Sequence, residues 1–223
     1  MHKWVSVGVD LAGTPKRQTG VSRMTGDLYC EACTVKEDEE IIKYVGESCP
    51  EVVAIDAPLS LPKNNQALRE CERKLMKIGI RIFPPTFSGM RLLTERAIKL
   101  RERLEALGYR VIEVYPGGAQ DFLGIPRKNM GLSLLREGLL KIGVKGLRGN
   151  ETGDELDAVT CSFIGVLFLR GAYVEVGDTH EGVIIMPVAP NRLDAYFQKK
   201  SLTLSSTTER LKYSPLTVCS SMG

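Results

Sequence analysis

The sequence contains few histidines, which bind zinc, and few aromatic residues, which stack on nucleobases. It has two histidines, one tryptophan and 6% aromatic residues in 223 positions. Its C-x-x-C motif, Cys30 to Cys33, lies in a predicted strand, where an offset of three residues directs the two side chains to opposite faces. We therefore expect no zinc site, and no platform for base stacking is evident.

Long apolar runs are absent as well. No run approaches the roughly 18 residues of a membrane span, and the N-terminus lacks the apolar region of a secretory signal. The hydrophobic fraction of 43% and the charged fraction of 26% are ordinary for a globular protein. We expect a cytoplasmic location, no membrane partner and one hydrophobic core.

The net charge is only +3, but positive residues are concentrated in the middle of the chain. Residues 63–148 contain 18 basic and 8 acidic residues, a local excess of +10, and the remainder sums to −7. One interpretation is a surface that attracts a polyanion beside an acidic site. The other is a set of solvated helix faces that carry lysine and arginine.

Carboxylates stand at three separate places that a folded chain can bring together. Asp10 and Asp56 each follow a predicted buried strand, and Asp154 and Asp157 open the most apolar predicted helix. A buried carboxylate is costly to keep charged without a partner. Converging carboxylates repel one another unless a cation holds them, and a set of oxygen ligands suits Mg²⁺ or Mn²⁺.

The hydrophobic pattern predicts an α/β domain with a mixed sheet, because an antiparallel meander is followed by βαβ units. Residues 1–200 are predicted to form a single domain with a helical insertion at about 63–108, and residues 201–223 a flexible tail. Strands are predicted at 4–11, 18–25, 27–35, 52–57, 109–114, 172–177 and 182–188, and helices at 37–48, 64–79, 90–107, 131–142 and 154–170.

One predicted helix of the insertion carries a basic stripe. Arg69, Arg73 and Lys77 recur every four residues within 64–79 and so share one face. We predict that they bind nucleic acid, and a solvated face is the alternative.

Glu113 is a further candidate carboxylate. It ends a predicted strand before Tyr115-Pro116-Gly117-Gly118, which we predict to be a tight turn. Its side chain is expected either to join the site or to make structural hydrogen bonds.

Four segments, in this order, resemble a family of predicted nucleases of ribonuclease H fold (domain of unknown function 429). The segments are residues 7–13, 53–59, 112–116 and 154–158. The resemblance implies a ribonuclease-H-like mixed sheet in β-β-β-α-β-α-β-α order, with the helical insertion between strands four and five. It also implies a relation to RuvC-type resolvases.

The resemblance further implies a metal-dependent phosphodiesterase that cleaves DNA or RNA. Two Mg²⁺ or Mn²⁺ ions would activate water and stabilise the leaving oxygen. Asp10 would be the central ligand, Asp56 the ligand of the second strand, and Asp157, Asp154 or both the ligands from the helix.

Each carboxylate also has a structural interpretation. Asp10 could accept hydrogen bonds from the loop at residues 13–19, and Asp56 could shape the turn before a proline. Asp154 and Asp157 could simply stabilise the positive end of a helix dipole.

Two other functions are compatible with the sequence. Sugar kinases and actin-like ATPases share this core fold, and residues 10–20 are faintly similar to their phosphate loop, which would make the protein an ATP-dependent phosphotransferase or nucleotide-binding protein. The other alternative is a non-catalytic nucleic-acid-binding module. The sequence leaves the oligomeric state open, and a homodimer is compatible with it.

Overall fold

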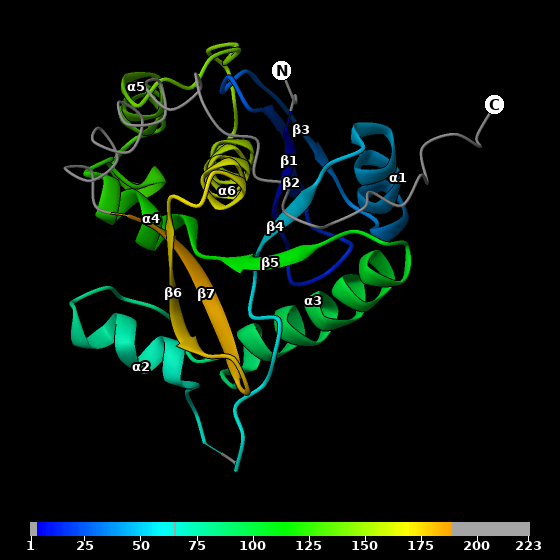
Figure 1. Ribbon diagram of the computed structural model, residues 1–223, viewed down its shortest axis with the longest axis vertical. Helices are drawn as coiled ribbons and strands as arrows, with labels where there is room; N and C mark the ends of the chain where they lie inside the picture. The colour runs from blue at the N-terminus through cyan, green and yellow to red at the C-terminus, as the bar shows by residue number, and fades with distance from the viewer. Residues whose placement is uncertain (1–3, 65, 189–223) are drawn as a thin grey trace, which may run out of the picture.

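A seven-stranded sheet lies at the centre of the computed structural model, which describes residues 4–64 and 66–188 (Figure 1). The strands are β1 (Val5–Asp10), β2 (Thr19–Thr25), β3 (Cys30–Val35), β4 (Val52–Asp56), β5 (Val111–Val114), β6 (Tyr173–Asp178) and β7 (Gly182–Pro187). The helices are α1 (Asp38–Ser48), α2 (Glu70–Lys77), α3 (Ser88–Ala106), α4 (Pro116–Leu123), α5 (Leu132–Lys141) and α6 (Gly153–Leu169), with a short 3-10 helix, η1 (Lys128–Met130). The predicted tail, 201–223, lies outside the described residues.

The sheet has the strand order β3-β2-β1-β4-β5-β7-β6. β2 pairs antiparallel with both β1 and β3, whereas β1, β4 and β5 run parallel to one another. β6 and β7 form an antiparallel hairpin at the far edge. This arrangement confirms the predicted ribonuclease-H-like mixed sheet, with α2 and α3 inserted between the fourth and fifth strands.

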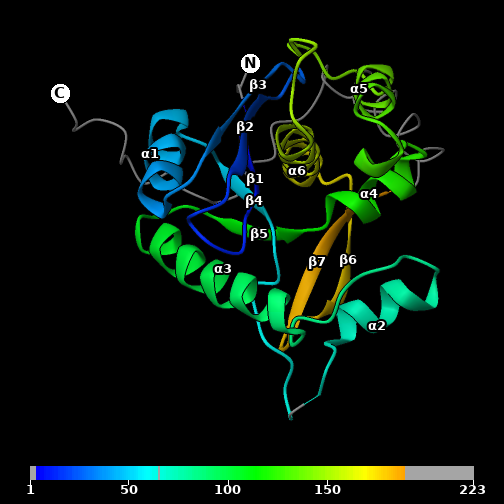
Figure 2. The same ribbon diagram turned by 180° about the vertical axis from the view of Figure 1, so that it is seen from behind.

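Helices cover both faces of the sheet (Figures 1 and 2). Val7 and Val9 of β1 pack with Ile41 of α1 and Leu100 of α3 in one buried cluster. The residues that alternate with them face α6, which lies on the opposite side of the sheet. Within the described part of the chain, no helix has the length and apolar character needed to cross a membrane.

Two glycines allow α6 to lie directly on the sheet. A Cβ atom at Gly8 of β1 would overlap the backbone of Ala158 and Ser162, and one at Gly20 of β2 would overlap the backbone carbonyl of Asp154. The N-terminal part of α6 is therefore held against the strand ends, backbone against backbone. This contact places the helix carboxylates beside those of the strands.

Two predicted elements differ from the structure. The predicted turn after β5 is the start of α4, because Pro116 occupies the first helical turn, where its missing N–H costs nothing. The predicted helix 64–79 begins only at Glu70, and Arg69 before it has an extended backbone. The second difference changes the interpretation of the basic stripe, as described below.

Candidate functional site

Two of the predicted carboxylates lie side by side at the ends of neighbouring strands. Asp10 and Asp56 are the last residues of β1 and β4, and they are register partners in this parallel pair. Because side chains alternate along a strand, Asp10 shares the face of Gly8 and Asp56 that of Ala54. That is the face covered by α6.

The first turns of α6 supply the other two carboxylates. Thr152 caps the helix: its Oγ1 accepts a hydrogen bond from the backbone N of Glu155 at 3.2 Å, and the Glu155 carboxylate accepts one from the backbone N of Thr152 at 2.7 Å. Asp154 and Asp157 follow within this capped segment. The positive end of the helix dipole stabilises carboxylates in this position.

A single ammonium group joins three of the four carboxylates. The Nζ atom of Lys128 lies 2.8 Å from Asp157 Oδ2, 3.3 Å from Asp154 Oδ1 and 3.4 Å from Asp10 Oδ2. Asp157 and Asp10 are 9% and 15% exposed, whereas Asp154, at 45%, lies at the rim. The carboxylates of β1 and α6 therefore converge on one cation, and both candidate helix residues reach it.

Burial makes the negative charge of this cluster costly. It is the main reason why the pKa of Asp10 is raised to about 7; Lys128 opposes the rise, while Asp157 and Asp154 add to it. Burial, followed by the charges of Asp10 and Asp157, also raises the pKa of Asp56 well above its usual range. A bound cation favours the charged form of such groups. The donor set thus fits a hard cation bound by oxygen atoms.

Gln120 of α4 fixes the orientation of Asp157. Its Nε2 atom donates to Asp157 Oδ1 at 2.8 Å and to Thr160 Oγ1 at 3.1 Å, and its side chain is buried. One oxygen of Asp157 is therefore held by the amide, and the other binds Lys128. Neither Gln120 nor Lys128 was predicted from the sequence.

The carboxylates open into two cavities that share Asp10 and Lys128 in their walls. One, of about 350 Å³, is also lined by Asp56 and Asp157. The other, of about 380 Å³, is also lined by Asp154. Both cavities thus leave carboxylates accessible.

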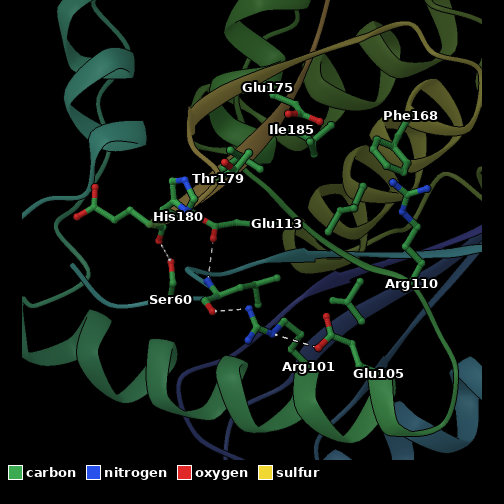
Figure 3. A pocket seen from close by; sticks show the side chains of 16 residues that line it. Ser60, Arg101, Glu105, Arg110, Glu113, Phe168, Glu175, Thr179, His180 and Ile185 are labelled. Atoms are coloured by element: carbon green, nitrogen blue, oxygen red, sulfur yellow. Dashed lines mark hydrogen bonds and ion pairs between the residues drawn. The ribbon is translucent and has the colours of Figure 1, made fainter. Parts of the chain in front are cut away.

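Glu113 makes structural hydrogen bonds, one of the two roles that the sequence left open. It pairs in register with Ile55, one residue before Asp56, and so its side chain faces away from α6. Its carboxylate accepts hydrogen bonds from the backbone N of Leu59 and from Arg69 Nη1, both at 2.8 Å. Glu113 lines the cavity that contains Asp56 and also a further cavity of about 400 Å³, which it shares with Arg101 and other residues (Figure 3).

The prediction that Arg69 binds nucleic acid is wrong. Its side chain is fully buried, and its Nη2 lies 2.5 Å from both Glu72 Oε1 and Glu113 Oε1. Arg69 precedes α2 in an extended conformation, so the four-residue spacing does not place it on the same helix face as Arg73 and Lys77. A guanidinium in this position cannot reach a polyanion.

Arg73 and Lys77 remain candidates for binding nucleic acid. Arg73 is 36% exposed and binds Glu70 at 2.9 Å, whereas Lys77 is exposed. Neither lines the two cavities at the carboxylates.

A second group of potential ligands surrounds Arg69. Cys71, Glu72 and Glu113 each place one ligand atom within 4.8 Å of the others. The guanidinium of Arg69 already forms ion pairs with both carboxylates there. This group is therefore a buried ion-pair cluster, and a cation at this point would have to displace an internal arginine.

Comparison with known proteins places this chain in a family. Residues 8–181 match the family described as "Protein of unknown function (DUF429)". The chain belongs to this family. The DUF429 match spans all four predicted metal ligands and Lys128 and confirms the family resemblance. The chain is also similar to the Thermus thermophilus RuvC structure, with a TM-score of 0.44 and 15% identity over 75% of this chain and 96% of that one. A comparison with curated proteins finds no match.

Proposed function

We propose that this protein is a Mg²⁺- or Mn²⁺-dependent phosphodiesterase that hydrolyses nucleic acid at the cluster of Asp10, Asp56, Asp154 and Asp157. The observation that carries the proposal is the position of the Lys128 ammonium among three carboxylates, one from β1 and two from α6. Carboxylates that already surround an ammonium group are also suited to surround a metal ion. Its oxygen-only donors match Mg²⁺ and Mn²⁺.

The residues of this chain have different parts in the proposed site. Asp10 and Asp157, the most buried pair around Lys128, would hold the ion, with Asp56 beside Asp10 and Asp154 at the rim. When bound, the ion supplies positive charge for the transition state and lowers the pKa of the attacking water. Gln120 keeps Asp157 in the binding orientation.

Lys128 has two successive tasks in this proposal. It reduces the repulsion among the carboxylates before the ion binds, because three of them lie within 3.4 Å of its Nζ atom. Its side chain is 42% exposed, so the ammonium can turn toward the cavities when a divalent ion takes its place. There it would pair with a substrate phosphate.

Cleavage assays test the proposal directly. Purified protein with Mn²⁺ is incubated with single-stranded, duplex and branched DNA and with RNA, and products are resolved on denaturing gels. We expect cleavage that requires the metal and that is lost in Asp10→Asn. No cleavage of any of these substrates would refute the proposal.

Controls separate the alternatives. The exposed-lysine variant Lys141→Met should cleave like the wild type.

Strong thermal stabilisation by ATP with Mg²⁺, without cleavage, would favour the phosphotransferase or nucleotide-binding alternative. Salt-sensitive DNA binding that is unaffected by Mn²⁺ and by Asp10→Asn would favour the non-catalytic binding module.

A further inference from the structure

Two aromatic side chains are exposed at the edge of the carboxylate site. Phe83 is 69% exposed and Phe87 is 63% exposed. Both line the cavity of about 380 Å³ that contains Asp154, and Phe83 also lines the cavity of about 350 Å³ that contains Asp56. Large apolar groups that remain exposed beside a polar site mark a binding surface.

The segment that carries these rings is held in place. The Tyr115 hydroxyl donates to the carbonyl of Arg81 at 2.5 Å, just before the segment. The backbone N of Phe87 donates to the carbonyl of Pro84 at 3.1 Å and closes a turn. Pro84 and the following Pro85 restrict the backbone further. The rings are therefore presented without a large ordering cost on binding.

Polar groups line the same cavity. Arg17 and Gln18, in the loop after β1, are exposed and contribute to its lining together with the two phenylalanines. A guanidinium binds phosphate through paired N–H donors. The cavity thus combines aromatic rings, a phosphate-binding group and the carboxylates of the proposed metal site.

We propose that this cavity binds an unpaired nucleotide next to the phosphodiester that is cleaved, an inference that rests on the proposed function and narrows its substrate to single-stranded segments. The base stacks on Phe83 and Phe87, and Arg17 pairs with a phosphate. Within a duplex, neighbouring bases cover both faces of each base. Only an unpaired base offers a free face to an aromatic ring.

Binding without cleavage tests the inference. Fluorescence anisotropy in EDTA measures the affinity of the full-length protein for a labelled single-stranded oligonucleotide and for its duplex. Each ring removed, in Phe83→Ala and Phe87→Ala, should weaken single-strand binding about fivefold or more, while duplex binding changes by less than about twofold. Tyrosine at either position should preserve affinity, because the ring remains.

Matched controls come from the same insertion. Met76 and Leu92 are 51% and 57% exposed but line neither cavity, so Met76→Ala and Leu92→Ala should leave single-strand binding unchanged. Arg17→Ala should lower the slope of log affinity against log salt by about one, whereas the phenylalanine variants should not change it.

The outcomes separate this inference from the proposed function. If the Phe83→Ala and Phe87→Ala variants bind the single strand like the wild type, or lose duplex binding equally, the nucleotide site is refuted even where Mn²⁺-dependent cleavage persists. Selective loss of single-strand binding supports the site. If that loss is found in a protein that cleaves nothing with Mn²⁺, the hydrolase proposal fails and the binding site stands.

Discussion

Two groups of carboxylates in this protein form ion pairs with different kinds of cation. Glu72 and Glu113 surround Arg69, whose side chain is fully buried and lies 2.5 Å from each of them. Asp10 and its neighbours surround Lys128, whose side chain is 42% exposed and lies 2.8 to 3.4 Å from three carboxylates. The first cation is part of the core. The second comes from the short 3-10 helix η1 and lines two cavities.

This difference teaches how a metal site can be recognised among acidic groups. The planar guanidinium of Arg69 forms several fixed hydrogen bonds, and removing it would leave charges buried without partners. The ammonium of Lys128 is a point charge on a flexible stem, so another cation can replace it. Proximity of carboxylates alone does not identify a metal site. What matters is whether the internal cation can leave.

The largest expected effect is on the Arg69 cluster. Arg69→Met leaves Glu72 and Glu113 without their partner and should lower the free energy of unfolding by about 3–5 kcal/mol. Urea denaturation measures this loss. Arg73→Met, at a partly exposed pair, should cost less than about 1 kcal/mol. Equal losses in the two variants would contradict the assignment of Arg69 to the core.

Metal should stabilise only one of the two clusters. Mn²⁺ at a hundred times its dissociation constant should raise the free energy of unfolding of the wild type by about 2.7 kcal/mol. Calorimetric melting with and without EDTA measures the gain. Asp157→Asn should abolish it, whereas Glu72→Gln, although less stable itself, should retain it. A gain that depends on Glu72 would move the metal site to the other cluster.

The close packing of α6 can be disturbed without touching a carboxylate. Gly8→Ala forces a methyl group into the helix backbone and should cost about 1–3 kcal/mol of stability. It should also weaken Mn²⁺ binding, as measured by isothermal titration calorimetry, because Asp10 and Asp157 move apart. Gly46→Ala in α1, where the nearest atom would be 3.9 Å away, is the control and should leave both quantities unimpaired.

The smallest expected effect sharpens the role of Lys128. Lys128→Met removes the internal competitor, so the affinity for Mn²⁺ should rise roughly fivefold, or by about 1 kcal/mol. The same titration on Lys141→Met, an exposed lysine of α5, should match the wild type. Weaker Mn²⁺ binding in Lys128→Met would show that the lysine supports the ion instead of competing with it.

The strand carboxylates could be predicted because their signal is local. Asp10 and Asp56 each end a buried strand, and parallel strands that are neighbours in the sheet bring such ends together. The capped start of α6 carries its own signal in Asp154 and Asp157. The order of these elements along the chain was sufficient to predict a mixed sheet.

The remaining site residues depend on contacts between distant parts of the chain. Lys128 lies in the short segment between α4 and α5, 118 residues after Asp10, and nothing in its neighbours indicates a role. Gln120 belongs to α4, whose Pro-Gly-Gly start resembles a turn. The proline at the first helical position was the available signal for that helix.

For two other candidates, Arg69 and Glu113, a shift of one residue decides where the side chain lies. Arg69 lies one residue before the start of α2, so the four-residue period of the basic stripe does not apply to it. Its side chain lies in the core. Glu113 precedes the position in register with Asp56 by one residue, which sends it to the other face of the sheet. Strand register and helix boundaries are set by tertiary packing, so residue types alone could not settle either case.

The contact between α6 and the sheet at Gly8 and Gly20 would limit which ions the proposed metal site accepts. Asp10 and Asp157 extend from backbone segments that touch, so repacking of side chains cannot widen the gap between them. A donor set of fixed width discriminates by ionic radius, and Mg²⁺ requires a smaller and more regular shell of oxygen atoms than Ca²⁺. In the proposed metal site, two residues without side chains would therefore act as selectors of ion size.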